Sequence, residues 1–291
     1  MNADRTRPTV GFIGLGDQGL PMARAIAEAG FPLHAWARRP TSLDGLRGVP
    51  HTGHDDIRDL AAACDIVGLC VSTDDDVLQL VEGGLLGLRP GAVLVNHGTG
   101  LPATAVRLTE ICAPAGIDVL DAPVSGGRPA AEERRLTTLV GGPQTALERC
   151  EPVFASFSRH VVHLGGAGAG QAAKLFNNTL LALNQAAIAD IVGLAVRMGL
   201  DPERLVGALK LGSASSAALN LLNTMVTPDN VDHLSGVEAL DIELFDTAVR
   251  AAGVDPGEVT ERGLAGARGL PGLLRFLNPH HPAATAGDGR K

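Results

Sequence analysis

The segment Val10-Gly11-Phe12-Ile13-Gly14-Leu15-Gly16-Asp17-Gln18-Gly19 decides the fold of this 291-residue chain. Its apolar start predicts a strand, and residues 20–29 have the pattern of a helix that ends at Gly30. Between them, G-x-G-x-x-G spacing permits a tight turn, close approach of a pyrophosphate to the backbone, and close packing of helix on strand. We therefore predict dinucleotide binding at Gly14, Leu15, Gly16, Asp17, Gln18 and Gly19. The alternative is an ordinary glycine-rich loop between a strand and a helix, with no role in dinucleotide binding.

Short apolar runs alternate with helical patterns as far as about Leu164. This order is typical of a parallel sheet with crossover helices. We predict an α/β fold in which residues 1–167 form an N-terminal Rossmann domain with a doubly wound parallel sheet. Its strands are expected at Val10–Ile13, Leu33–Trp36, Ile66–Cys70, Val93–Asn96, Asp118–Asp121, Leu136–Val140 and Val161–Leu164.

The second half of the chain has only helical signals. Residues 171–199 form one Ala/Leu/Ile-rich run without proline, which predicts a single long helix. A glycine group at residues 165–170 marks the junction, so residues 168–291 are expected to form an all-α domain with a frayed tail from about residue 279. Further helices are expected at Pro202–Leu211, about Ser215–Val226, Gly236–Ala252 and Pro256–Ala267.

Composition excludes several classes of protein. The formal net charge is -8 and no Lys/Arg run exceeds two residues, so a nucleic-acid partner is not expected. Four cysteines without C-x-x-C spacing indicate buried small side chains and fit a reducing cytoplasm, and we predict no metal site. The N-terminus is unlike a signal peptide, and no stretch approaches the roughly 20 consecutive apolar residues of a membrane helix, so no membrane association is expected.

The end of the second predicted strand indicates which dinucleotide binds. An acidic residue there would bond the ribose of NAD, whereas a basic residue would accept the extra phosphate of NADP. The segment contains Arg38 and Arg39 and no acid until Asp44. We therefore predict that NADP (NADPH) is preferred over NAD, the alternative being a solvated arginine pair.

Two further stretches point to a reaction centre. Ser125, Gly126 and Gly127 follow a predicted strand at the edge where open α/β sheets bind ligands, and their hydroxyl and backbone N–H groups can hold a carboxylate. Lys174, Asn177 and Asn178 have the spacing of one helix face. A lysine beside an apolar pocket can exchange the proton of a reacting hydroxyl group. The alternatives are an ordinary turn and a solvated surface lysine.

These stretches resemble the β-hydroxyacid dehydrogenases. The resemblance is carried by D-A-P-V-S-G-G at residues 121–127, L-T-T-L-V-G-G at 136–142 and G-A-G-Q-A-A-K-L-F-N-N at 168–178, and it spans nearly the whole chain. It implies a fold like that of 6-phosphogluconate dehydrogenase, a small-molecule substrate and a homodimer. It further implies that Lys174 and Asn178 are catalytic, that Ser125, Gly126, Gly127 and Asn177 bind substrate, and that Ser72, Thr99 and Asp241 lie at the cofactor.

Several positions depart from the family's pattern. Gln18 replaces a methionine, Gly98 replaces a serine before Thr99, and residues 128–135 are charged where small residues are usual. More consequentially, Leu240 replaces the lysine of a Lys-Asp-Leu segment, and Ala217 stands where tryptophan is common. These two changes remove a cation and a large side chain, so we expect a substrate that is bulkier or less anionic than a three- or four-carbon hydroxy acid.

Three functions remain open from the sequence. The first is an NADP-dependent oxidoreductase that transfers a hydride between the nicotinamide and a β-hydroxy acid or its semialdehyde or keto partner, with Lys174 as general acid/base. The second is an NADPH-dependent imine reductase on the same fold, against which the retained Lys174 and Asn178 argue. The third is a non-catalytic cofactor-binding interaction protein.

Overall fold

The computed structural model of the protein describes residues 7–281. The tail predicted from residue 279 therefore lies, from residue 282 on, outside the described residues. The chain divides into two compact units, Met1–Lys174 and Leu175–Lys291. The division falls inside the long helix α7 (Ala169–Arg197), which the sequence predicted over residues 171–199.

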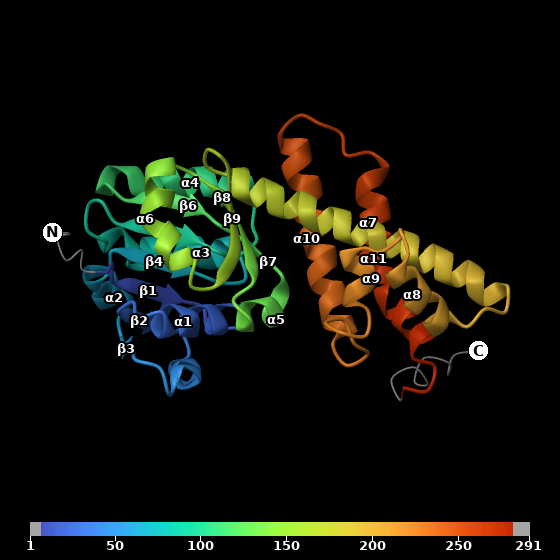
Figure 1. The fold of residues 1–291 in the computed structure, drawn as a ribbon. Coiled ribbons are helices and arrows are strands. Elements are labelled where there is room, and N and C mark those ends of the chain that lie inside the picture. The colour runs from blue at the N-terminus through green and yellow to red at the C-terminus, as the bar shows by residue number, and fades with distance from the viewer. Residues whose placement is uncertain (1–6, 282–291) are drawn as a thin grey trace. The chain divides into compact units, whose positions relative to one another are not determined.

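Unit 1 contains one nine-stranded sheet in the order β3-β2-β1-β4-β5-β6-β8-β7, with β9 paired to β8 (Figure 1). From β3 through β6 the strands are parallel, and Phe12 in β1 stands between Ala35 and Gly68. The strands are β1 Val10–Ile13, β2 Leu33–Trp36, β3 Thr52–Gly53, β4 Ile66–Leu69, β5 Val93–Asn96, β6 Asp118–Asp121, β7 Val124–Ser125, β8 Leu136–Gly141 and β9 Ser158–Gly165.

The sheet is not parallel throughout. β8 pairs antiparallel with both β6 and β7. Ala122 and Pro123 interrupt one continuous pairing with β8, in which Asp121 of β6 lies opposite Gly141 and Val124 of β7 lies opposite Thr138. The two-residue strands β3 and β7 were not predicted, because a period-2 pattern cannot show in two residues.

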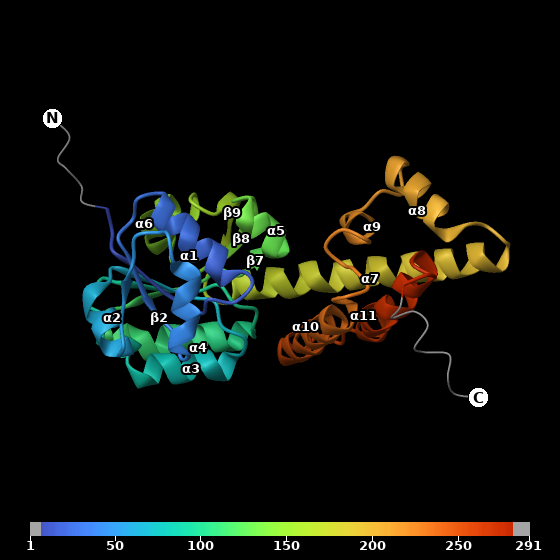
Figure 2. The ribbon, with the colours of Figure 1, turned by 90° about the horizontal axis from the view of Figure 1, so that it is seen from below.

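Helices cover both faces of the sheet. Figure 2 shows α1 and α6 on one side of it and α3 and α4 on the other. The first face buries Phe12, Met22 and Phe154, and the second buries Leu69, Leu80 and Leu108. The helices are α1 Gly19–Glu28, α2 Ile57–Ala63, α3 Asp74–Gly83, α4 Pro102–Cys112, α5 Gly127–Glu132 and α6 Gln144–Phe154, with 3₁₀ segments at Pro40–Leu46, Leu85–Gly87 and Ala113–Ala115.

Unit 2 consists of helices. After its part of α7 come α8 Pro202–Leu211, α9 Ala217–Leu221, α10 Val231–Ala251 and α11 Glu258–Leu277, and α10 packs along α11 (Figure 1). α8 has its predicted bounds, but the helix expected at Ser215–Val226 is confined to α9, because Asn223 takes a left-handed backbone with φ +59°. α11 runs ten residues beyond its predicted end, through Pro271, because Leu270, Leu273, Leu274 and Leu277 pack into the core.

Helix α7 is long and apolar enough, by length and composition alone, to cross a membrane. Its most apolar 18-residue window has a mean hydropathy of 1.7, and 39% of that window is buried within the structure. The expectation that no stretch comes near this criterion is therefore wrong for α7. That expectation required an unbroken apolar run, whereas an average over 18 residues tolerates polar residues such as Asn184 and Gln185. Core helices of globular domains meet the same criterion, so the evidence for a membrane span is weak.

Candidate functional site

The loop between β1 and α1 has the geometry that phosphate binding requires. Gly14 has φ +95°, and a Cβ atom there would lie 2.2 Å from the Cys70 carbonyl oxygen. A Cβ on Gly19 would lie 1.9 Å from the Gly14 carbonyl oxygen, so this glycine lets the helix approach the turn. A Cβ on Gly16 would meet nothing within 4 Å, which leaves open space where a pyrophosphate must approach. The loop thus fits a dinucleotide.

A pocket of about 420 Å³ lies at the carboxyl ends of β1, β2 and β4. Of the residues predicted for the cofactor, it brings together Gly14, Leu15, Gly16, Arg38, Arg39 and Ser72. Trp36, Val71 and Leu80 give it an apolar wall, which suits an adenine ring. Asp17 and Gln18 do not line this pocket. The residues predicted for the cofactor at the ends of β1, β2 and β4 therefore converge on one pocket.

The two arginines of this pocket differ in their surroundings. Arg38 donates to a carboxylate oxygen of Asp76 at 2.5 Å, although its side chain is 67% exposed. This hydrogen bond is the main cause that holds the pKa of Asp76 below its usual value, and a hydrogen bond from the Thr73 hydroxyl is the next. Arg39 is exposed and forms no ion pair with any residue in 7–281. Arg39 is therefore the arginine whose charge is not already balanced by a carboxylate.

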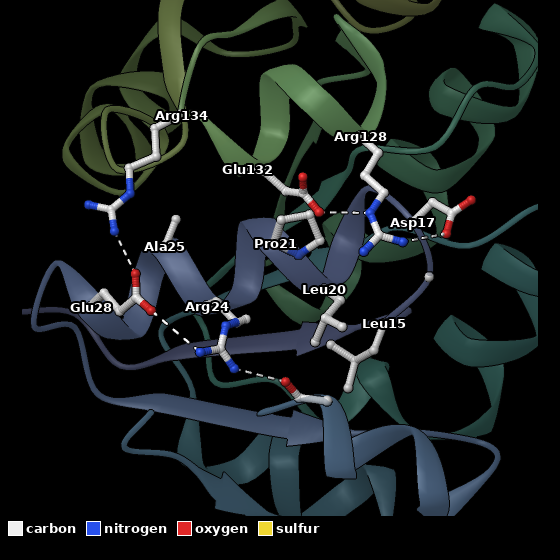
Figure 3. A pocket seen from close by; sticks show the side chains of 12 residues that line it. Leu15, Asp17, Leu20, Pro21, Arg24, Ala25, Glu28, Arg128, Glu132 and Arg134 are labelled. Atoms are coloured by element: carbon white, nitrogen blue, oxygen red, sulfur yellow. Dashed lines mark hydrogen bonds and ion pairs between the residues drawn. The ribbon is translucent and has the colours of Figure 1, made fainter. Parts of the chain in front are cut away.

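A second pocket, of about 520 Å³, lies between α1 and α5 and is lined by charged side chains (Figure 3). Arg128 contacts Asp17 at 3.6 Å and Glu132 at 2.7 Å. On the other side of the pocket, Glu28 pairs with both Arg24 and Arg134. The charged stretch 128–135, where small residues are usual, thus forms ion pairs with α1 and the loop before it. Asp17 points to Arg128 and not into the cofactor pocket.

The first turn of α7 is bound to the sheet by Asp121. Both carboxylate oxygens of this buried residue accept hydrogen bonds at 2.8 Å, one from the Gly168 amide and one from the Gln171 amide. These are orphan N–H groups of a helix N-terminus, and a carboxylate there stabilises the helix. Burial raises the pKa of Asp121, while the two backbone hydrogen bonds lower it. Asp121 therefore fixes where α7 begins.

Gln171 connects the same turn to the loop after β5. Its Oε1 accepts from the Gly100 amide at 2.9 Å, and its Nε2 donates to the Gly98 carbonyl at 2.8 Å. Thr99, which the resemblance assigned to the nicotinamide side, lies between these two residues and is half-buried. Gln171 thus holds the Thr99 loop with two hydrogen bonds. Lys174 follows Gln171 by three residues and is buried, with 8% of its surface exposed.

The predicted carboxylate-binding turn follows β7. Ser125 is half-buried and pairs with Thr137 of β8 in the sheet. Gly126 has φ +130°, a backbone conformation that favours glycine, and Gly127 begins α5. The turn therefore presents a hydroxyl group next to backbone without side chains.

In unit 2, Asn178 is held by Asp241. The Nδ2 of Asn178 donates to a carboxylate oxygen of Asp241 at 2.6 Å, and Asn177 donates to Asn178 at 2.9 Å. Asp241 is buried, while its neighbour Leu240, which replaces the usual lysine, is 50% exposed. The structure thus brings Asn177, Asn178 and Asp241 into one hydrogen-bonded group. A direct contact of Asp241 with a cofactor stays a prediction.

Sequence reasoning missed three residues that shape these sites: Asp121, Gln171 and Asp76. Asp121 and Gln171 stood inside the quoted motifs, but nothing in the motifs showed that their side chains bind the helix start and the Thr99 loop. Asp76 lies 38 residues after Arg38, and no local pattern joins the two. Capping of α3 by Thr73 with Asp76 three residues later was the one available signal.

Comparison with known proteins agrees with this geometry. Residues 9–165 match the family described as the NAD binding domain of 6-phosphogluconate dehydrogenase. Residues 168–261 match the one described as NAD-binding of NADP-dependent 3-hydroxyisobutyrate dehydrogenase. The fold and the loop therefore define an NAD(P)-dependent oxidoreductase with a Rossmann domain and a helical C-terminal domain.

Comparison with individual proteins identifies the family within this class of oxidoreductase. A 3-hydroxyisobutyrate dehydrogenase of Pseudomonas aeruginosa is 36% identical over 217 residues, which cover 74% of this chain and 73% of that protein. A solved Mycobacterium tuberculosis 3-hydroxyisobutyrate dehydrogenase with L-serine has a TM-score of 0.79 at 28% identity, covering 88% of this chain and 91% of the other. A reductive aminase from Aspergillus terreus with NADPH, at 19% identity and a TM-score of 0.63, covers 95% of this chain and all of its own; it shares the fold. The chain belongs to the β-hydroxyacid dehydrogenase family.

Proposed function

We propose that the protein is an NADPH-dependent oxidoreductase that interconverts a β-hydroxy acid and its semialdehyde or keto partner, with Lys174 as general acid/base. The observation that carries the proposal is the anchoring of Lys174. It is buried in a helix whose first turn is bound to β6 by Asp121 and to the Thr99 loop by Gln171. A fixed, mostly desolvated amine beside a dinucleotide-binding domain suits proton transfer to a reacting oxygen.

The chain's residues have separable roles in this reaction. The bound nicotinamide supplies or accepts the hydride. Lys174 takes the proton of the substrate hydroxyl in one direction and returns it to the carbonyl oxygen in the other. Ser125 and the amides of Gly126 and Gly127 hold the substrate carboxylate. Asn178 follows Lys174 by one turn of α7 and, fixed by Asp241, orients substrate together with Asn177.

The preference for NADP rests on Arg39. It lines the cofactor pocket with Ser42 and carries a charge that no carboxylate of the described chain balances. Arg38 contributes less, because Asp76 competes for its guanidinium. The supporting argument is that a phosphate gains most from the cation with no other partner. The ratio of Michaelis constants for NADPH and NADH tests this preference, and a smaller value for NADH would contradict it.

The substrate is expected to be bulkier or less anionic than 3-hydroxyisobutyrate. Leu240 supplies no cation and Ala217 leaves room where the family has a large ring. The deciding experiment offers hydroxy acids, keto acids and semialdehydes of increasing size to the purified protein, with NADPH absorbance as the readout, and includes cyclic imines in parallel. Turnover of the larger oxo acids supports the proposal. Rapid turnover of 3-hydroxyisobutyrate or glyoxylate contradicts the size argument, and turnover of imines alone contradicts the reaction class.

Helix α7 is proposed to pack against a second copy of this chain. It carries exposed apolar side chains at Phe176, Leu180, Ile191 and Leu194, each about half exposed or more, and the exposed Met198 follows its last residue. We place the homodimer in the cytoplasm, because the four cysteines are free thiols. Light scattering coupled to size exclusion, together with fractionation of cells into membrane and soluble parts, tests both statements. A monomer, or protein confined to the membrane fraction, would contradict them.

A further inference from the structure

Two polar side chains of unit 2, one buried and one half-buried, each have a buried oxygen without a hydrogen-bond partner among the described residues. Gln185 of α7 is 1% exposed, and its Nε2 donates to Oε1 of Glu238 on α10 at 3.1 Å. The remaining oxygen of each group, Oε1 of Gln185 and Oε2 of Glu238, is buried and finds no partner in the part of the chain that the structure describes. Buried polar atoms without partners are uncommon and call for a physical reason.

A single proton accounts for both atoms. An ionised carboxylate and an amide oxygen are acceptors only, so neither can donate to the other. When Glu238 carries a proton, its second oxygen becomes a donor, and the acid and the amide can form two reciprocal hydrogen bonds. The bond already present, from Gln185 Nε2 to Glu238 Oε1, is one half of that pair. The second hydrogen bond of the pair would run from the protonated Oε2 of Glu238 to Oε1 of Gln185, the two atoms that lack partners.

The surroundings of Glu238 also favour its neutral form. Burial raises the pKa of Glu238 to about 7, the hydrogen bond from Gln185 opposes this, and the negative charge of Asp241 raises it further. Asp241 lies three residues further along α10. Two arginines of α11 pair with other carboxylates, Arg262 with Asp190 of α7 and Arg268 with Glu243 of α10.

We propose that Glu238 is a protonated acid which, paired with Gln185, positions Asp241 and through it Asn178. The proposal rests on the proposed function of Asn178. With Glu238 neutral, polar side chains of α7 and α10 join at Gln185–Glu238 and at Asn178–Asp241. Loss of the proton places two carboxylates one turn apart on α10 and leaves Gln185 Oε1 unpaired. The Asn178–Asp241 contact then shifts, so Glu238 is a positioning residue and does not itself touch substrate.

The first arm of the test detects the proton without turnover. Infrared difference spectra between acidic and alkaline pH, with ¹³C-labelled glutamate, should show a protonated carboxyl carbonyl band that disappears near pH 7 in the wild-type protein. Glu238→Gln should lack this band, whereas Glu243→Gln, an exposed glutamate of the same helix, should keep it. If Glu238→Gln keeps the band, the proton is elsewhere and the proposal is wrong.

The second arm follows Asn178 itself. The side-chain amide resonance of Asn178, assigned by its loss in Asn178→Asp, should shift near pH 7 in the wild type and stay constant in Glu238→Gln. In turnover, Glu238→Leu should lower kcat/KM about tenfold, and Glu238→Gln should restore most of it and remove the pH step. A resonance that does not respond to Glu238 overturns the positioning role even if the band is present. If no substrate is turned over, the proposed reaction fails, while the band and the resonance still decide about Glu238.

Discussion

The phosphate loop of unit 1 and the polar group of unit 2 differ in how the sequence encodes them. The loop depends on backbone sterics within six consecutive residues, where each glycine has a steric reason that can be stated. The unit 2 group depends on side chains of α7 and α10 that lie 53 and 63 residues apart in the chain. A local backbone constraint leaves a readable motif, whereas a long-range polar pair leaves none. Each prediction below tests one side of this contrast.

The largest effect is expected at Lys174, which belongs to a local motif. Lys174→Met should lower kcat about a thousandfold, because removing a general acid/base costs two to four orders of magnitude. Lys174→Arg should also be nearly inactive, since a guanidinium keeps its proton. Cofactor affinity, measured by NADPH fluorescence, should change less than threefold, because the phosphate loop is intact. Lys210→Met in α8 is the matched control and should keep its activity.

The outcome that contradicts the Lys174 assignment is simple to recognise. If Lys174→Met oxidises NADPH at the wild-type rate on the best substrate of the panel, Lys174 is not the acid/base. The non-catalytic alternative predicts a different result, namely no turnover in either protein. The wild-type measurement therefore separates the two cases before the variant is made.

Three glycines test the steric argument for the loop. Gly19→Ala should cost about 3 kcal/mol of unfolding free energy, because its Cβ would lie 1.9 Å from a carbonyl oxygen and close-packed interiors tolerate overpacking poorly. Gly16→Ala should leave stability unchanged and weaken NADPH binding at least tenfold, since only the ligand needs that space. Gly83→Ala, at an open position in α3, is the control and should be neutral or slightly stabilising. Denaturant unfolding and fluorescence titration measure both quantities, and equal behaviour of Gly16 and Gly19 would refute the division of roles.

The two units should respond to pH in opposite directions. Burial lowers the pKa of His97, in unit 1, to about 4, so its neutral form is favoured and stability is lost as pH falls from about 6.5 to 4. Burial raises the pKa of Glu238, in unit 2, to about 7, so stability is lost as pH rises from about 4.5 to 7. Each effect should be about 3 kcal/mol, since one pKa unit corresponds to about 1.4 kcal/mol.

Hydrogen exchange resolved by segment can separate these two effects. Protection of β5 should weaken below pH 6, and His97→Phe, which retains packing among Phe12, Phe154 and Phe157, should remove that dependence. Protection of α10 should weaken towards pH 7, and Glu238→Gln should remove that dependence. If β5 and α10 show the same pH profile, His97 and Glu238 are not the groups responsible.

The sequence predicted elements whose pattern repeats and missed those fixed by distant contacts. The strands β1, β2, β5 and β6 have their predicted bounds; the first three are runs of four mostly apolar residues, and β6 has Val119 and Leu120 between two aspartates. α11 was predicted too short, because its last turns are helical through packing around Pro271 rather than through local preference. For the candidate site, Lys174 and the loop glycines came from motifs. The partners that position them, Asp121 and Gln171, were visible only once the chain was folded.

The smallest effect concerns the two arginines of the cofactor pocket. Both come from a local motif, but Arg38 is paired with Asp76, which lies 38 residues further along the chain. Arg39→Ala should raise the Kd for NADPH about tenfold and leave that for NADH nearly unchanged, since it removes a cation without another partner. Asp76→Asn should tighten NADPH binding a few-fold by releasing Arg38, because an exposed ion pair contributes about 1 kcal/mol or less. Arg47→Ala, an exposed arginine at the end of the same segment, is the control. If Arg38→Ala weakens NADPH binding more than Arg39→Ala, the phosphate displaces Asp76, and the long-range pair rather than the motif determines the choice of cofactor.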